Sequence, residues 1–121
     1  MVDIRVNIVA AGLMELGFSE YEARVYLSLL EESRPATAYE AGKSSGVPTS
    51  KVYEVLKKLM RKGVISVIDE GRTKKYVPME PDEFLGKYKN RTEKVIESLR
   101  SSMLMGRGRR EASYIWNIDQ C

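Results

Sequence analysis

The segment SGVPTSKVYEVLKKLMRKG, residues 45–63, combines a tight turn with an amphipathic helix. Gly46 suits the left-handed cap that ends a preceding helix, and Pro48 restricts Val47 to an extended conformation. In the helix that follows, apolar residues recur at helical spacing and form one buried stripe: Val52, Val55, Leu56 and Leu59. The pattern predicts the second helix of a helix-turn-helix.

This helix needs a cap at its start and a stop at its end. We expect Thr49 or Ser50 to cap its N-terminus and Gly63 to end it. Upstream, Ser19–Glu22 and Thr37–Glu40 each form a capping box, in which the hydroxyl and the carboxylate bond each other's backbone amides. The boxes predict a helix over residues 20–32 and a short one that ends before Gly46.

Two apolar faces are expected on the first helices. On the helix that follows Ser19, the predicted face consists of Ala23, Tyr26, Leu27 and Leu30. A still earlier helix is predicted over residues 4–16, ending before Gly17. The positions at helical spacing are Ile4, Ile8, Ala11 and either Met14 or Glu15.

The residues after Gly63 predict a two-stranded hairpin. Residues 64–68 are mostly β-branched, Gly71 lies in a turn, and residues 74–78 form the return strand. A hairpin is marginally stable alone, so it must pack against the helices. The element order is that of a winged helix-turn-helix, a mainly α fold with a small β-hairpin.

The charge is concentrated in one part of the chain. The 121 residues carry a formal net charge of +3, yet the segment 43–75 holds nine basic and three acidic residues and so carries +6. Concentrated positive charge is typical of proteins that bind the phosphate backbone, although a solvated basic surface explains it equally well.

The composition offers little for catalysis, metal binding or membrane insertion. Histidine is absent, the one cysteine is Cys121, and neither a zinc spacing nor a phosphate loop occurs. No run of 18 apolar residues and no signal peptide is evident. We therefore expect a cytoplasmic protein that is not an enzyme and has no cofactor, no metal and no evident small-molecule site.

The candidate DNA-binding residues lie on the exposed face of the helix after Pro48 and on the hairpin. A helix fits the major groove, and its N-terminus suits a phosphate. Glu54 could accept from a cytosine or pair with Lys58, and Tyr53 could contact DNA or flank the core. The full set is Pro48, Thr49, Ser50, Lys51, Tyr53, Glu54, Lys57, Lys58, Arg72, Lys74 and Lys75.

A long helix is expected to begin at Pro81, because proline and the acidic residues after it suit the positive helix end. Its apolar stripe forms either a dimer seam or an intramolecular contact with the first helices. The stripe consists of Leu85, Tyr88, Val95, Ile96, Leu99 and Met103. Gly106 to Arg110 is expected to break the helix, and residues 114–118 are interpreted as an isolated strand.

We thus divide the chain into a winged helix-turn-helix DNA-binding domain over residues 1–80, a helix over 81–105 that serves as the dimer seam, and a basic linker with a short tail over 106–121. The function expected is that of a sequence-specific, homodimeric transcription regulator that binds double-stranded DNA. A winged-helix module that binds proteins of the transcription machinery is the alternative.

Two stretches resemble the TrmB-like family of archaeal transcription regulators. They are LGFSEYEARVYL, residues 16–27, and SGVPTSKVYEVL, residues 45–56, followed by Leu59, Lys62 and Gly63. The resemblance covers roughly residues 12–100. It implies a winged-helix domain that binds promoter DNA as a dimer through a C-terminal helix. It also implies that Pro48 to Tyr53 begin the recognition helix and that Arg72 to Lys75 form the wing.

The sequence departs from this family at two places. Ala41, Gly42 and Ser44 are smaller than the family's usual residues, and a helical Gly costs about 1 kcal/mol relative to Ala. The departure predicts that the first helix of the motif is short, loosely packed or shifted. Residues 112–118 resemble the cut-off first strand of the family's sugar-binding effector domain, so the chain is either a stand-alone member or a piece of a longer one.

Overall fold

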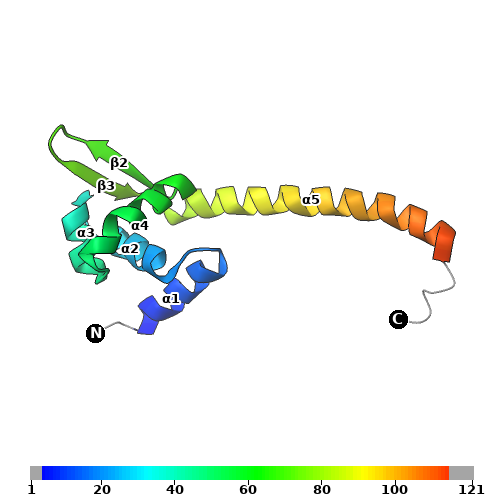
Figure 1. Cartoon of the computed structure of the whole chain (residues 1–121), viewed down its shortest axis with the longest axis horizontal. Helices are drawn as coiled ribbons and strands as arrows, with labels where there is room; N and C mark the ends of the chain where they lie inside the picture. Colours follow the sequence, from blue (N-terminus) through cyan, green and yellow to red (C-terminus); the bar gives the residue numbers. More distant parts are fainter. Residues whose placement is uncertain (1–3, 115–121) are drawn as a thin grey trace. The chain divides into compact units, whose positions relative to one another are not determined.

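The computed structural model describes the backbone of residues 4–114 and the side chains of residues 7–106. The chain forms two compact units, residues 1–81 and residues 82–121. The first unit holds α1 (Ile4–Glu15), α2 (Glu20–Glu31), β1 (Ala36–Thr37), α3 (Ala38–Ser45), α4 (Thr49–Lys62), β2 (Ile65–Asp69) and β3 (Lys74–Pro78) (Figure 1). It is a winged helix-turn-helix, as predicted, and α5 (Pro81–Tyr114) continues into the second unit.

The predicted helix ends are mostly confirmed. Both capping boxes are present, with Ser19 Oγ accepting from the Glu22 amide at 3.1 Å and Thr37 Oγ1 accepting from the Glu40 amide at 3.1 Å. Gly46 ends α3 and Gly63 ends α4, each at a φ of 74° in the left-handed region. Each residue has the backbone freedom that its position requires.

The prediction that Thr49 or Ser50 caps α4 is wrong. Pro48 occupies the N-cap position, at a φ of −55°, and no side chain caps the helix start. Thr49 and Ser50 therefore lie inside the first turn, and both residues are exposed. Their hydroxyls remain available to a partner outside the chain.

The core of the first unit lies between α2, α4 and the sheet. The predicted stripe of α4 is confirmed, since Val52, Val55, Leu56 and Leu59 are all buried. On α2 the prediction is half right: Ala23 and Tyr26 are buried, but Leu27 and Leu30 are only half-buried. Val25 and Leu29 are buried in their place, because α2 is covered over a wider arc than one face.

The predicted face of α1 is wrong. Ile8 and Met14 are exposed, whereas Ala10 and Leu13 are buried. Both sets recur at helical spacing, so periodicity alone does not tell which set faces the core. Packing of α1 on α2 decides, and Phe18 just beyond α1 is buried as well.

The structure shows that α3 is short, as one of the three alternatives had it, but not loosely packed. The helix spans eight residues, and Ala41 within it is 1% exposed, so α3 is short but well packed. A Cβ on Gly42 would lie 2.7 Å from Val52 Cγ2. Gly42 therefore allows α3 and α4 to approach closely. The lack of a side chain at this position permits the close packing of the helix-turn-helix.

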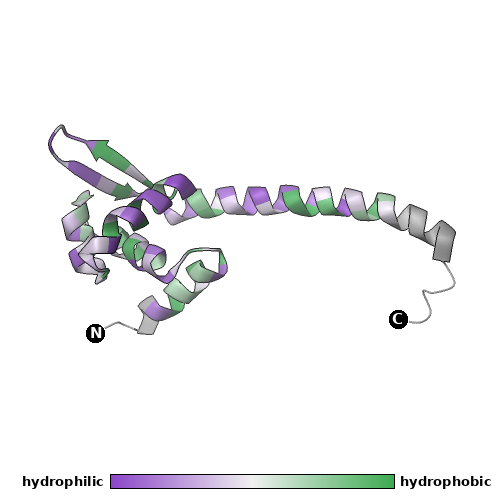
Figure 2. Cartoon of the chain, in the orientation of Figure 1, coloured by the Kyte–Doolittle hydropathy of each residue, from purple (hydrophilic) through white to green (hydrophobic). Residues whose placement is uncertain are grey.

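The sheet has three strands, not the two predicted. Its order is β1-β3-β2, and all pairs are antiparallel. In β2–β3, Val67 pairs with Tyr76, and the short β1 adds Ala36 opposite the same tyrosine. We call β2, β3 and their turn the wing. Figure 2 shows hydrophobic residues on β2, and on β3 a hydrophilic start followed by a hydrophobic end.

The long helix extends further than predicted. α5 continues through Gly106 and Gly108 to Tyr114, so the expected break at residue 106 is wrong. The penalty of Gly106 and Gly108 is about 1 kcal/mol each, and good helix formers lie on both sides of them. Of the strand predicted over 114–118, Tyr114 is helical, and the rest lies outside the described residues.

Candidate nucleic-acid interface

The outer face of α4 is a continuous polar surface. All eight predicted contact residues from Pro48 to Lys58 are exposed. Tyr53 is 64% exposed, so it does not belong to the core. The buried stripe on the opposite face fixes the helix in the domain, and the exposed face is free to enter a groove.

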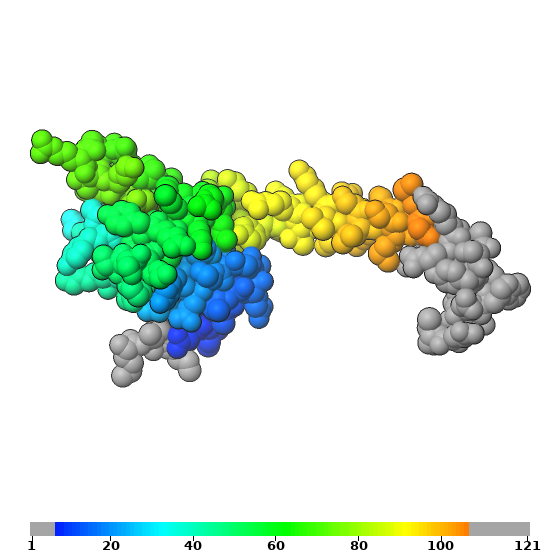
Figure 3. All heavy atoms as spheres, in the orientation of Figure 1, coloured from blue at the N-terminus to red at the C-terminus, as the bar shows by residue number. Residues whose placement is uncertain are grey.

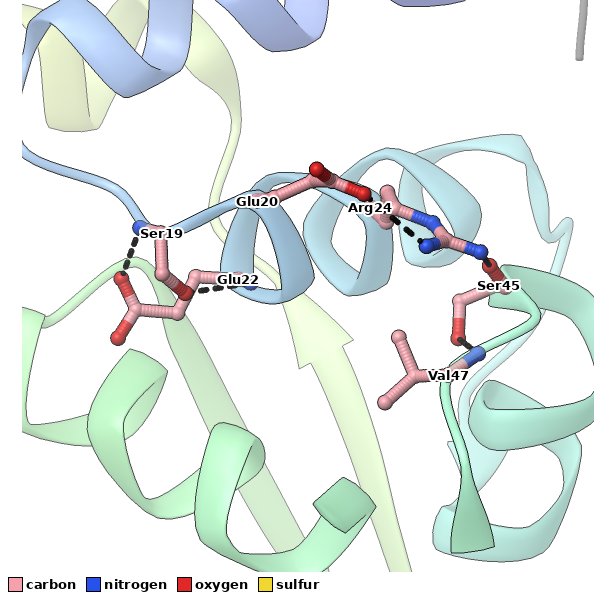
Figure 4. A network of polar contacts seen from close by, with 6 residues as sticks. All are labelled: Ser19, Glu20, Glu22, Arg24, Ser45 and Val47. Atoms are coloured by element: carbon pink, nitrogen blue, oxygen red, sulfur yellow. Dashed lines mark hydrogen bonds and ion pairs between the residues drawn. The ribbon is translucent and has the colours of Figure 1, made fainter.

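A polar network fixes the turn that precedes α4 (Figure 4). Arg24 on α2 donates from Nη2 to the Ser45 carbonyl oxygen at 3.1 Å, and its Nη1 lies 3.3 Å from Glu20 Oε2. The Ser45 hydroxyl accepts from the Val47 amide at 3.3 Å, and Val47 is buried. The network orients the start of α4, and sequence reasoning missed it because Arg24 and Ser45 are 21 residues apart.

Some of the basic residues among the predicted contacts form ion pairs, and the others do not. Lys58 pairs with Glu54 and Lys75 with Glu70, each at 3.5 Å. The predicted i,i+4 pair on α4 is thus confirmed, and it occupies the Glu54 carboxylate.

Lys62 has a structural role. Its ammonium lies 3.5 Å from the buried carboxylate of Glu22 and 5.9 Å from the ring centroid of Phe18. It therefore joins the end of α4 to the start of α2.

Four of the six basic side chains among the predicted contact residues remain available. Among residues 7–106, no carboxylate lies within ion-pair distance of Lys51, Lys57, Arg72 or Lys74. Two of them lie on α4 and two on the wing. These four cations, which we call the free cations, are the strongest candidates for phosphate contacts.

The wing is anchored at its base and projects at its tip. At the base, the Tyr26 hydroxyl of α2 donates to the Met79 carbonyl oxygen at 2.7 Å. Burial, and then the charge of Glu80, raise the pKa of Tyr26 well above its usual value. At the tip, Gly71 has a φ of 84° and donates its amide to Asp69 Oδ1 at 3.0 Å. Figure 3 shows the tip projecting beyond the helices of the same unit.

A hollow of about 300 Å³ lies between the helices and the wing. We call it the tyrosine hollow. Its lining includes Tyr39, Tyr53, Arg72, Thr73, Lys74 and Tyr76. Tyr76 is 5% exposed, and burial, followed by the proximity of Tyr53, raises its pKa. Tyr39 is 69% exposed, and sequence reasoning missed it because it lies on α3, outside the expected recognition helix.

The stripe predicted on α5 is exposed in a single copy of the chain. Leu85 and Ile96 are each 39% exposed, and Val95, Leu99 and Met103 are more so. Tyr88 is half-buried and packs edge-on against Phe84, with 6.0 Å between ring centroids.

Two other kinds of site are absent from the part of the chain that the structure describes. There, no three acidic, histidine or cysteine residues are placed to hold a metal ion. No helix in that part is long and apolar enough to span a bilayer.

The sequence is similar to that of a known family and of known proteins. Residues 13–82 match the family described as "Sugar-specific transcriptional regulator TrmB". The chain is 47% identical over 85 residues to the uncharacterized protein YrhO of Bacillus subtilis, covering 70% of this chain and 29% of YrhO. It is 33% identical over 90 residues to TrmBL1, a sugar-sensing transcriptional regulator of Pyrococcus furiosus, covering 74% of this chain and 26% of TrmBL1.

Solved structures show the same fold. TrmBL2, described as an archaeal chromatin protein, has a TM-score of 0.78 at 24% identity, over 94% of this chain and 44% of that protein. The transcriptional regulator Tm0710 of Thermotoga maritima has a TM-score of 0.54 at 19% identity, over 97% of this chain and 85% of its own.

The chain spans less than a third of the length of the two curated relatives. One of them comes from Bacillus subtilis, so the resemblance does not fix an archaeal source. The matching family and Tm0710 are both described as transcriptional regulators. The family match over residues 13–82 and the winged-helix fold together show that the chain belongs to the TrmB family of transcriptional regulators.

Proposed function

We propose that the chain binds duplex DNA in a sequence-specific manner, with the N-terminal half of α4 in the major groove and the wing on the backbone. The observation that carries this proposal is the distribution of the free cations. Lys51 and Lys57 lie on the exposed face of α4, and Arg72 and Lys74 lie on the wing. Groove-facing residues on α4 read bases, and wing cations neutralise phosphates.

The predicted contact residues take different parts in this proposal. Thr49, Ser50 and Tyr53 supply hydroxyls at the helix start, where Pro48 leaves the first turn uncapped. Lys51 supplies a charge in the same turn. Glu54 and Lys58 neutralise each other and contribute less to affinity. In the same way, Lys75 is partly neutralised by Glu70.

We propose further that α5 joins two copies into a homodimer. With Thr92 included, its stripe recurs at spacings of three and four residues from Leu85 to Leu99, which is the pattern of a helix seam. Two copies would present two recognition helices about 34 Å apart, to half-sites one helical turn apart. In this arrangement residues 1–80 bind DNA, α5 holds the dimer, and the protein acts in the cytoplasm.

A salt titration tests DNA binding. A preferred sequence is first selected from random duplexes, and its affinity is measured by fluorescence anisotropy across a salt series. The logarithm of the association constant should fall linearly with the logarithm of salt concentration, because phosphate contacts release counterions. A flat response would overturn the proposal and favour a protein-binding module.

Substitutions locate the contacts. Lys51→Ala combined with Lys57→Ala should lower affinity at least tenfold and reduce the salt slope by about 2, because each lysine neutralises one phosphate. Lys87→Ala combined with Lys89→Ala removes the same charge from exposed positions of α5 and should change affinity less than threefold. Equal effects of the two pairs would refute a specific role for α4.

The dimer has its own test. Light scattering of the whole chain should give twice the mass of 13.8 kDa. Val95→Glu combined with Leu99→Glu should give the monomer mass, because charge in an apolar seam is costly. Ser98→Glu, at an exposed residue outside the stripe, serves as the control and should remain dimeric. A monomeric wild-type chain would refute the seam.

A further inference from the structure

The tyrosine hollow combines features that ordinary protein surface lacks. Tyr39 and Tyr53 expose 69% and 64% of their surface, although large aromatic rings are usually more buried. They come from successive helices, and a second hollow of about 140 Å³ between α3 and α4 is lined by the same two rings. The close approach at Gly42 brings the two helices together beneath them.

The chemistry of the lining selects an anion with an apolar flank. Arg72 and Lys74 belong to the free cations, and Thr73 adds a hydroxyl. Within residues 7–106, the hollow is lined by no carboxylate. The phenol of Tyr39 can donate one hydrogen bond, and its ring offers a flat apolar surface. Phosphate attached to deoxyribose matches this set of groups.

We propose that the tyrosine hollow holds one sugar-phosphate segment of the DNA strand that borders the major groove. Tyr39 donates its phenolic hydrogen to a phosphate oxygen, Arg72 and Lys74 neutralise that phosphate, and the ring of Tyr53 packs on the deoxyribose. Tyr39 is thereby assigned as a positioning residue that fixes the register of α4 on the duplex. This assignment rests on the proposed DNA binding and extends it to α3.

The contact predicts a specific pattern of defects. Tyr39→Phe removes one hydrogen bond to a charged acceptor and should weaken binding about tenfold. Because phosphate contacts carry no sequence information, the affinities for the selected duplex and for random duplexes should fall by the same factor. Because Tyr39→Phe removes no charge, the salt slope should stay unchanged, whereas Arg72→Gln should reduce it by about 1.

Chemically modified DNA tests the contact directly. A single neutral methylphosphonate is placed in turn at each phosphate of the selected duplex, and affinities are measured for the wild-type chain and for Tyr39→Phe. At one phosphate of each half-site, the methylphosphonate should lower the affinity of the wild-type chain at least tenfold. At the same phosphate, the factor by which the affinity of Tyr39→Phe falls should be at least three times smaller. Tyr21→Phe, the same change on α2 outside the hollow, is the matched control and should behave as the wild type.

The outcomes separate this inference from the function on which it rests. Equal losses for the wild-type chain and Tyr39→Phe at every phosphate would overturn the inference, and so would an affinity of Tyr39→Phe within twofold of wild type. In either case, a defect of the Lys51 and Lys57 variant would leave DNA binding by α4 standing. A wild-type chain that binds no duplex would overturn both.

Discussion

Gly42 lies within α3, where helix propensity and tertiary packing make opposite demands. Alanine stabilises a helix interior by about 1 kcal/mol relative to glycine. The same methyl group would lie 2.7 Å from Val52 Cγ2, well inside van der Waals contact. The sign of the effect of Gly42→Ala on stability therefore shows which demand is stronger.

The response of Val52 decides how much Gly42→Ala changes the stability. Val52 is 2% exposed and lies in α4, where a β-branched side chain strongly prefers one rotamer, so its methyl group cannot turn away without cost. Adding a methyl group to a packed core costs about 1–3 kcal/mol. Against the propensity gain of about 1 kcal/mol, we expect Gly42→Ala to lower the free energy of unfolding by about 1 kcal/mol.

Urea unfolding of the whole chain measures the effect. The NMR intensities of the Ala23, Val55 and Leu59 amides report on the first unit rather than on α5. Gly12→Ala in α1 is the matched control, since nothing lies within 4 Å of its added Cβ, and it should stabilise by about 1 kcal/mol.

A double-mutant cycle isolates the cause. In a Val52→Ala background the clashing methyl group is gone, so Gly42→Ala should then stabilise the domain. The coupling between the two positions should reach about 1–3 kcal/mol. A Gly42→Ala variant more stable than wild type, or a coupling near zero, would refute the argument that close helix packing requires glycine here.

Three further changes probe the scaffold of the site. Tyr26→Phe should lower the free energy of unfolding by about 1 kcal/mol at neutral pH, through loss of a buried hydrogen bond, measured by urea unfolding. Because the folded state raises the pKa of Tyr26 above the usual 10.0, the wild-type chain should lose stability as the pH rises above about 10, when the unfolded chain releases this proton first. The slope should be shallower in Tyr26→Phe, and equal slopes would contradict the reasoning. Ser19→Ala should cost about 1 kcal/mol by removing a helix cap, and an unchanged urea midpoint would argue against it. Arg24→Leu should weaken DNA binding in the anisotropy assay while the chain stays folded by circular dichroism, because the bond to the Ser45 carbonyl orients the start of α4; Arg34→Leu, at an exposed loop position, is the charge control.

Local interactions made much of the fold predictable. Each capping box and each glycine stop depends on hydrogen bonds that span only a few residues. The stripe of α4 has one apolar face opposite a charged one, so its orientation toward the core follows from its own periodicity. Because the periodicity of α4 also places its polar residues on the opposite face, all of the exposed residues of that face could be predicted together.

Contacts between distant residues were decided only by the tertiary structure. α1 offers two apolar faces at the same spacing, and packing on α2 selects the one with Leu13. The two-residue strand β1 is too short to leave a periodic signal and forms because β3 offers a free edge. The close approach at Gly42 reverses the meaning of its small size, which in the sequence alone suggests weakness.

The candidate site likewise has features that follow from the sequence and features that only the tertiary structure decides. The identity of the basic residues and their place on α4 and the wing follow from the sequence. Which of them are free depends on the position of each carboxylate in space, and Glu22 engages Lys62 from 40 positions away along the chain. The tyrosine hollow is likewise a tertiary feature, since Tyr39, Tyr53 and the wing are joined by no local pattern. Periodicity and capping are properties of single segments, whereas a site assembled from three segments exists only once their packing has set the distances between them.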